Sequence, residues 1–262
     1  MEISTGLGLM LGFGALIISV ILEGGSPMAL VNLPAAVIVF GGTFGATLIS
    51  FPLKRFLALG SLIAQSFQAY KGDPQTIIDL FVKLADQARR EGLLSLEEEA
   101  SKIPDAFIRK GVMLIVDGVD PAVVRDIMET DTHLVSERHK SGYSMLEAMG
   151  GFAPTMGIIG TVMGLINVLS RLSDPENLGH SIAVAFIATL YGVSSANLLW
   201  LPLGNKLKQK SRAEIQAREV AIEGVLAVQA GENPRIVREK LESFLAPKQR
   251  GKAPTTEAAE QE

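Results

Sequence analysis

The sequence lacks a charged side chain at the centre of any of its four long apolar stretches. Two of these stretches, Phe152 to Leu172 and Ile182 to Leu203, nevertheless contain glycine, serine, threonine and asparagine. A membrane span that carries hydroxyls and amides but no carboxylate cannot bind and release a proton by itself. If the protein conducts ions, we therefore expect a partner protein to supply the titrating group.

Other absences narrow the class of protein. Cysteine is missing, which excludes disulfides and thiolate metal sites. His133 and His139 are six residues apart, which is not the i, i+4 spacing of a helical metal-binding pair. There is no Walker loop and no nucleophile elbow, and a net charge of −4 argues against nucleic-acid binding. We expect a protein that is not an enzyme and that needs no cofactor beyond a transported cation.

What the chain does contain is apolar. Of its 262 residues 48% are hydrophobic and 20% are charged, a balance typical of a protein that is part membrane and part aqueous. A membrane-spanning helix needs about 20 mostly apolar residues. The N-terminus has no basic region, so we expect the first stretch to be a retained span rather than a signal peptide. The predicted spans cover residues 3–22, 33–51, 151–172 and 182–203.

Basic residues near the ends of the spans predict the orientation. Lys54 and Arg55 follow the second span, and four basic residues between 206 and 212 follow the fourth. The loops 23–32 and 173–181 contain no lysine or arginine, and Arg171 is the single exception on that side. Because cytoplasmic loops are enriched in lysine and arginine, we expect a multi-pass protein with both termini in the cytoplasm.

The polar segment 53–150 has helical periodicity and no alternating strand pattern. Asp73 and Ser95 are predicted helix caps, with Pro74 in the first turn after Asp73. The predicted fold is an all-α membrane protein with this helical cytoplasmic domain between the second and third of four transmembrane helices. The predicted domains are hairpins at 1–52 and 151–203, the domain 53–150, cytoplasmic C-terminal helices at 204–246 and a disordered tail at 247–262.

Small residues recur in two of the predicted spans. The second span carries Gly41, Gly42 and Gly45, and the third carries glycines at positions 157, 160 and 164. Small residues four apart let helices approach closely in lipid. The pattern is compatible with ordinary packing inside the subunit or with packing against a partner's helix.

Two prolines and two threonines in the third and fourth spans each allow two interpretations. Pro154 and Pro202 either end the helices or act as hinges near the cytoplasmic face. Thr161 and Thr189 either bond back to their own helices or line a cation path with their hydroxyl oxygens.

A charge cluster surrounds Gly92-Leu93-Leu94 in the polar segment, and composition alone would make it a solvated face. Its members are Arg89, Arg90, Glu91, Glu97, Glu98 and Glu99.

Three segments together resemble the MotA/PomA family of flagellar motor stator A-subunits. The string from Ala153 to Leu165 (APTMGIIGTVMGL) resembles the family's third span, and Ala188–Gly192 with Asn197–Pro202 resembles the fourth. Arg89 to Glu97 (RREGLLSLE) is similar to its cytoplasmic motif. The resemblance covers the chain from about Met1 to Leu245.

The resemblance implies a stator subunit in the bacterial plasma membrane. Its expected partners are the MotB/PomB-type single-span B-subunit, which brings the ion-binding aspartate, a FliG-type rotor switch-complex protein, further copies in a ring of five, and membrane lipid. It implies that Arg89 and Glu97 contact the rotor, that Thr161 and Thr189 face the ion path, and that Pro154 and Pro202 lie near it.

The transported cation is H⁺ or Na⁺, and we favour Na⁺. Sodium-driven members of the family tend to carry threonine at the position of Thr161, where a hydroxyl oxygen can replace one hydration ligand of Na⁺. The alternative is an energy-transducing channel subunit of the ExbB/TolQ type, which four spans and the Arg89–Glu97 motif disfavour. A stand-alone channel or transporter is a third reading, and no ionisable residue inside the spans supports it.

Overall fold

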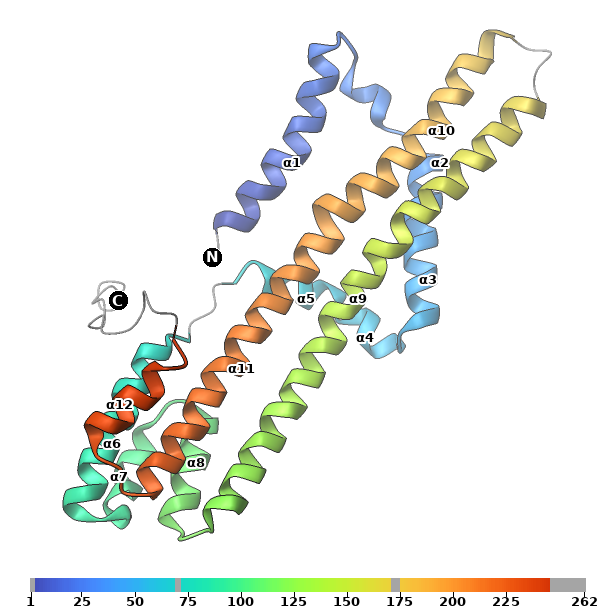
Figure 1. Cartoon of the computed structure of the whole chain (residues 1–262). Coiled ribbons are helices and arrows are strands. Elements are labelled where there is room, and N and C mark those ends of the chain that lie inside the picture. Colours follow the sequence, from blue (N-terminus) through green and yellow to red (C-terminus); the bar gives the residue numbers. More distant parts are fainter. Residues whose placement is uncertain (1–2, 69–71, 171–174, 246–262) are drawn as a thin grey trace. The chain divides into compact units, whose positions relative to one another are not determined.

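In a computed structural model that describes residues 3–68, 72–170 and 175–245, every regular element is a helix (Figure 1). Within these ranges there is no β-strand. The predicted all-α fold is therefore confirmed, and the chain is a membrane protein with a helical cytoplasmic domain between its second and third transmembrane helices. Arg171 and the predicted disordered tail 247–262 lie outside the described residues.

The chain forms two compact units, each assembled from two separate parts of the sequence. The first contains Met1–Ala69 and His139–Gln209, and the second contains Tyr70–Arg138 and Lys210–Glu262. Helices α9 (Pro121–Ser170) and α11 (Leu201–Gln229) contribute residues to both units. The helix α9 passes through residue 150 without a break, so the predicted domain edge at that residue has no counterpart in the helix itself.

The described residues contain four helices that are long and apolar enough to cross a membrane. Two of them lie near the N-terminus, the third is α9, and the fourth is the continuous helical stretch that runs from α10 into α11. The first two cover Ile3–Leu22 (α1) and Leu33–Ser50, beside the predicted spans 3–22 and 33–51, and the other two are the longer helical stretches Pro121–Ser170 and Ser181–Gln229, which contain no boundary at residue 151 or 203. The remaining elements of the first unit are η1 (Pro27–Leu30), α2 (Leu33–Ala36), η2 (Val37–Gly41), α3 (Gly42–Ser50), α4 (Leu53–Leu57), α5 (Leu59–Ser66), α10 (Pro175–Ser195) and η4 (Ala196–Trp200).

Glycines allow α9 and α10 to lie side by side (Figure 1). A Cβ atom added at Gly157 would lie 2.9 Å from the Ala188 carbonyl oxygen, and one added at Gly192 would lie 2.5 Å from the Ala153 carbonyl oxygen. At Gly164 it would meet Ala185 at 2.7 Å. The glycines of the third span therefore serve packing inside the subunit, and the reading in which they contact a partner's helix is wrong for these positions.

Two spans contain a wide helical turn. Residues Val37–Gly41 and Ala196–Trp200 are π-helical, with α-helical segments before and after them. The second wide turn directly precedes Pro202, which is the second residue of α11. Proline cannot donate a backbone hydrogen bond, and local π adjustments in membrane helices help to satisfy the backbone groups that it leaves free.

The second unit is a small helical domain with its own apolar core. Its helices are α6 (Pro74–Glu91), η3 (Leu93–Ser95), α7 (Leu96–Lys102), α8 (Ala106–Val116), α12 (Pro234–Glu242) and parts of α9 and α11. Ile78 and Phe81 of α6 are fully buried in this core, and Val225 of α11 joins the same cluster. Helix α11 is separated from α12 by a turn at Gly231, whose φ of 68° is available mainly to glycine.

One predicted cap is present and the other is not. The Asp73 carboxylate accepts a hydrogen bond from the Gln75 amide at the start of α6. Ser95 precedes α7, but its hydroxyl donates instead to the Gly92 carbonyl oxygen. The reason is that the 3-10 turn before α7 already holds Ser95 in a helical backbone conformation, which turns its side chain away from the amides it would cap.

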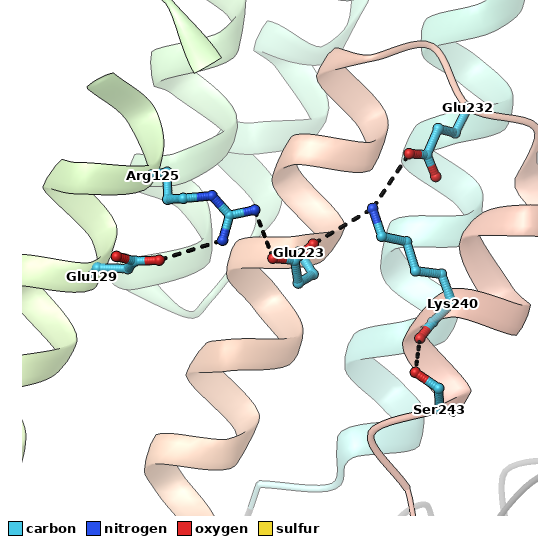
Figure 2. A network of polar contacts seen from close by, with 6 residues as sticks. All are labelled: Arg125, Glu129, Glu223, Glu232, Lys240 and Ser243. Carbon is cyan, nitrogen blue, oxygen red and sulfur yellow. Dashed lines mark hydrogen bonds and ion pairs between the residues drawn. The ribbon is translucent and has the colours of Figure 1, made fainter. Parts of the chain in front are cut away.

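A polar network joins three helices of this unit, as Figure 2 shows. The Arg125 guanidinium of α9 lies 2.7 Å from a Glu223 carboxylate oxygen of α11, and the other Glu223 oxygen is 3.5 Å from Lys240 Nζ of α12. The hydrogen bond to Glu223 raises the pKa of Arg125 above its ordinary value. A raised pKa means that the folded state is stabilised at every pH at which arginine is charged in the unfolded chain, so Arg125 contributes no pH dependence in the neutral range.

Candidate functional site

Thr161 of α9 and Thr189 of α10 meet through their hydroxyl groups. The two Oγ1 atoms share a hydrogen bond, and Thr161 Oγ1 also lies 3.0 Å from the Ala185 carbonyl oxygen and 3.1 Å from the Gly157 carbonyl oxygen. The Thr161 hydroxyl therefore does bond back to its own helix, at the Gly157 carbonyl oxygen, as the first of the two interpretations from the sequence requires. The same geometry also gathers two hydroxyl and two carbonyl oxygens at one point between the helices.

Such an oxygen cluster suits a weakly bound, partly dehydrated cation rather than a permanent metal ion. Neutral hydroxyl and carbonyl oxygens are the groups that replace water ligands around a moving alkali cation. In the described part of the chain no group of histidine, aspartate and glutamate side chains could hold a metal ion. The threonines therefore contribute ligand oxygens but no negative charge of their own.

The face of α9 around Thr161 is apolar and open. Ile158 and Val162 are more than half exposed, and Leu165 is 42% exposed. A soluble protein rarely exposes a contiguous group of such aliphatic side chains. Within a membrane, these side chains can contact lipid or another protein. This uncharged exposed wall beside the hydroxyl pair is what the absence of carboxylates in the sequence predicts.

Tyr191 holds the start of the second span against α10. Its hydroxyl donates a hydrogen bond to the Leu30 carbonyl oxygen and accepts one from the Asn32 amide, at 3.0 Å for the latter. Asn32 in turn caps α2 through the Ala35 amide. The tyrosine, which lies two residues after Thr189, thereby fixes the connector between the first two spans to the helix that carries Thr189.

The structure places Pro154 and Pro202 inside helices, so the reading in which they terminate the spans is wrong. Pro154 lies in the interior of α9 and is half-buried. Pro202 is exposed on α11 and lines a cavity between this helix and α1. Pro154 is not among the residues that line this cavity. Each proline leaves one helical carbonyl oxygen without its usual backbone donor, which is the property that a hinge requires.

A tight turn in the second unit presents the charge cluster. Gly92, with φ of 85°, reverses the chain between α6 and α7, and an amino acid with a Cβ atom would be strained there. Arg89 at the end of α6 and Glu97 at the start of α7 are both exposed. Their positions also suit the helix dipoles, with a cation near a C-terminus and an anion near an N-terminus.

Ion pairs inside the domain occupy only some members of this cluster. Arg90 lies 3.0 Å from Asp86, and Lys102 lies 3.0 Å from Glu98 and 2.8 Å from Glu99. The side chains of Arg89, Glu91 and Glu97 have no hydrogen bond or ion pair with any residue in the described ranges. Arg89 and Glu97, the two residues selected from the sequence, are thus available to an external partner.

One residue of this turn was not anticipated. Leu94, between Arg89 and Glu97, is 75% exposed, although its neighbour Leu96 is completely buried. The sequence offers a weak signal, because Leu93-Leu94 in a polar loop is unusual, but periodicity does not say which leucine faces outward. Burial of this leucine against another protein would remove apolar surface from water, which favours association.

Known proteins resemble the chain both in sequence and in structure. Residues 99–220 match the family model described as "MotA/TolQ/ExbB proton channel family". A protein of Bacillus subtilis named "Motility protein A" is 40% identical over 245 residues, which cover 93% of this chain and 91% of the relative.

Two solved structures share the fold over almost the whole chain. "Structure of C. jejuni MotAB" has a TM-score of 0.90 at 30% identity, covering 97% of this chain and 100% of that one. "Structure of the flagellar MotAB stator complex from Bacillus subtilis" has a TM-score of 0.87 at 39% identity, covering 94% and 97%.

Proposed function

The chain belongs to the MotA/PomA family of motility proteins, and on that premise we propose that it is the A-subunit of a cation-driven flagellar stator. The observation that carries the proposal is the combination of a carboxylate-free apolar wall with the Thr161–Thr189 oxygen cluster. The wall suits a passage whose titrating acid comes from another chain. The similarity to MotAB complexes supports a MotB-type partner as the source of that acid.

The proposed mechanism uses the cost of charge in an apolar medium. A partner aspartate that is ionised against the exposed aliphatic side chains of α9 is unfavourable, because desolvation penalises the charged form. A cation that enters from outside neutralises the aspartate and allows it to face this wall. Release of the cation toward the cytoplasm restores the charge, and the aspartate must then move to a more polar position.

Repetition of this cycle around a ring of A-subunits would produce rotation. We propose a pentamer around two B-subunits, because two sites facing an odd number of subunits are never equivalent, and the next step then has a defined direction. The ring would lie in the bacterial inner membrane with both termini of each chain in the cytoplasm. The basic residues after the second and fourth spans support this orientation.

Sodium remains the cation that we favour. Thr161 Oγ1 and Thr189 Oγ1 can each offer a lone pair to a partly dehydrated ion, together with the Ala185 carbonyl oxygen. A proton needs no such set of oxygen ligands, because it binds directly to the carboxylate. Pro154 and Pro202 are proposed to let α9 and α11 bend as the aspartate changes charge.

The turn around Gly92 is proposed to contact the rotor. Arg89 and Glu97 point charges of opposite sign away from the domain, and neither has an internal partner in the described residues. A FliG-type rotor protein with charges of both signs would complement this surface. An ExbB/TolQ-type role, the second candidate, offers no use for this pair of unpaired charges.

Ion flux in proteoliposomes tests the proposal. The chain is reconstituted alone, with its B-subunit, or with a B-subunit whose membrane aspartate is replaced by asparagine. Flux is expected only with the unmodified B-subunit. Selective cation flux through the chain alone would overturn the proposal in favour of a stand-alone channel.

The alternative role and the choice of ion need two further measurements. Restored swimming of a stator-less cell that receives both subunits separates a stator from an ExbB/TolQ-type transducer, which would conduct ions without restoring motility. Withdrawal of sodium at fixed pH separates the cations, since undiminished flux would exclude Na⁺.

A further inference from the structure

A cavity of about 290 Å³ lies between α1 and the region where η4 continues into α11. One wall comes from the first turns of α1, and the other comes from residues on either side of the π turn. The lining is amphipathic, with Lys206 beside Ser4 at the start of α1, and with Leu198 and the amide Asn197 toward the part of η4 that lies further along α1. Its lining consists of Ser4, Thr5, Gly8, Leu9, Asn197, Leu198, Pro202, Leu203 and Lys206.

The lining around Lys206 brings together a cation and two hydroxyl groups. Lys206 Nζ lies 3.5 Å from Ser4 Oγ. Thr5 Oγ1 is buried, although it has no hydrogen-bond partner among the described residues. A buried hydroxyl without a partner is unfavourable, and a bound group that accepts its hydrogen bond would remove the penalty. Beside a lysine, an anionic oxygen is the acceptor that fits.

The aliphatic part of the lining has room for a hydrocarbon chain. A Cβ atom added at Gly8 would meet nothing within 4 Å, so the glycine leaves open space beside α1. Leu9, Leu198 and Leu203 complete the aliphatic wall. Aliphatic space of this kind is favourable for a hydrocarbon chain, because burial of apolar surface is favourable and the wall offers water no hydrogen-bond partner.

We propose that this cavity binds one phospholipid of the cytoplasmic leaflet that carries a net negative headgroup, such as phosphatidylglycerol. The phosphate lies between Lys206 and the hydroxyls of Ser4 and Thr5, and an acyl chain follows Gly8 and Leu9. The proposal rests on the membrane orientation given under the proposed function, which puts Lys206 at the cytoplasmic surface. The aliphatic wall distinguishes a lipid from a free phosphate ion, which would gain nothing from it.

Native mass spectrometry of the purified A–B complex tests this site. The complex is exchanged into phosphatidylglycerol or phosphatidylcholine, and retained lipid is counted per A-subunit. Retention of phosphatidylglycerol alone is expected in the unmodified protein. Lys206→Gln should lower its retention about fivefold, since one lysine near an anionic surface contributes about 1 kcal/mol. Thr5→Val should lower it as well, and Gly8→Leu should prevent retention by filling the space of the acyl chain.

The matched control is Lys54→Gln, which removes an exposed basic residue after the second span and outside the cavity. Equal loss with Lys54→Gln and Lys206→Gln, or equal retention of both lipids, would overturn the proposal. Displacement of the lipid by millimolar inorganic phosphate would also overturn it, because the site would then be one for a free anion. Ion flux of the same complexes is measured in parallel, so a failed lipid site is not confused with a failed stator.

Discussion

The hydroxyl oxygens of Thr161 and Thr189, 28 residues apart in the chain, share a hydrogen bond across the α9–α10 contact. Thr161 also reaches the Ala185 carbonyl oxygen of the opposing helix. The two threonines thus form one polar unit between helices that also approach closely at Gly157, Gly164 and Gly192. A change at either residue is expected to alter both the helix contact and any ion that passes it.

Thr161→Val keeps the shape of the side chain and removes its oxygen. We expect the complex to assemble and the sodium concentration for half-maximal swimming speed to rise roughly fivefold, because one lost polar contact is worth about 1 kcal/mol. Thr189→Val should behave alike, and the double variant should add little, since the residues act as a pair. An unchanged sodium dependence in all three variants would remove Thr161 from the ion path.

Reversal of the exposed charges at the Gly92 turn should weaken rotor engagement without affecting assembly. Arg89→Glu and Glu97→Lys are each expected to reduce torque, measured as stall load on tethered beads, while membrane levels and ion flux stay unchanged. The matched controls are Arg90→Glu and Glu98→Lys, whose side chains are paired with Asp86 and Lys102. If the controls impair torque equally, the effect comes from net charge and not from the two unpaired residues.

Leu94→Ala should reduce the time for which each stator stays engaged with the rotor. Burial of apolar carbon contributes roughly 0.8 kcal/mol per CH₂, so truncation of a leucine that the contact buries is expected to cost about 2 kcal/mol. The domain itself should keep its stability, because Leu94 is 75% exposed. Val123→Ala, at another exposed position of the same unit, is the control. Turnover of single labelled stators at the motor measures the effect, and identical residence times in both variants would exclude Leu94 from the contact.

The close approach of α9 and α10 predicts the effect of a single methyl group. Gly192→Ala should destabilise the purified complex by about 1–3 kcal/mol, since its Cβ would lie 2.5 Å from the Ala153 carbonyl oxygen. Gly45→Ala is the control, because a Cβ atom there meets nothing within 4 Å. Thermal unfolding monitored by size-exclusion chromatography compares the two. Equal midpoints would show that the helices have room to move apart.

Glu223 connects α12 to the rest of the second unit through two cations. Glu223→Gln should loosen α12 by about 1 kcal/mol, the upper end for partly exposed ion pairs. Hydrogen exchange of the amides in residues 234–242 should then become roughly fivefold faster. Arg235→Gln, an exposed residue of the same helix, should leave exchange unchanged. Equal exchange in wild type and Glu223→Gln would mean that the Arg238–Asp79 ion pair and the apolar burial of Val237 and Leu241 hold α12 without Glu223.

The helices could be predicted from the sequence because their signals are local. A run of twenty mostly apolar residues without charge predicts the bounds of α1, and the Asp73-Pro74 pair predicts the start of α6. The uninterrupted course of α9 could not be foreseen, because Pro154 normally argues against a helix interior. The behaviour of Ser95 was also missed, since a 3-10 turn depends on the geometry of the whole α6–α7 connection.

The candidate site was partly predictable for a similar reason. Family motifs select Thr161, Thr189, Arg89 and Glu97, but contact between the threonines depends on glycines in both helices. Arg90 pairs with Asp86, and Glu98 pairs with Lys102, whereas Arg89 and Glu97 have no such partner in the described residues. Which members of the cluster are paired depends on where Asp86 and Lys102 lie in three dimensions. The outward position of Leu94 follows from the φ of Gly92, which no periodicity reveals.

The π-helical turns at Val37–Gly41 and Ala196–Trp200 each insert about one extra residue into the winding of a span. A helical wheel drawn straight through either turn therefore loses its phase, and side chains beyond it are assigned to the wrong side. Accessibility or cross-linking scans along these two spans should show a periodicity that resets at residues 41 and 200. Experiments that choose labelling positions by counting in steps of 3.6 along these spans will misplace probes that lie beyond residue 41 or residue 200.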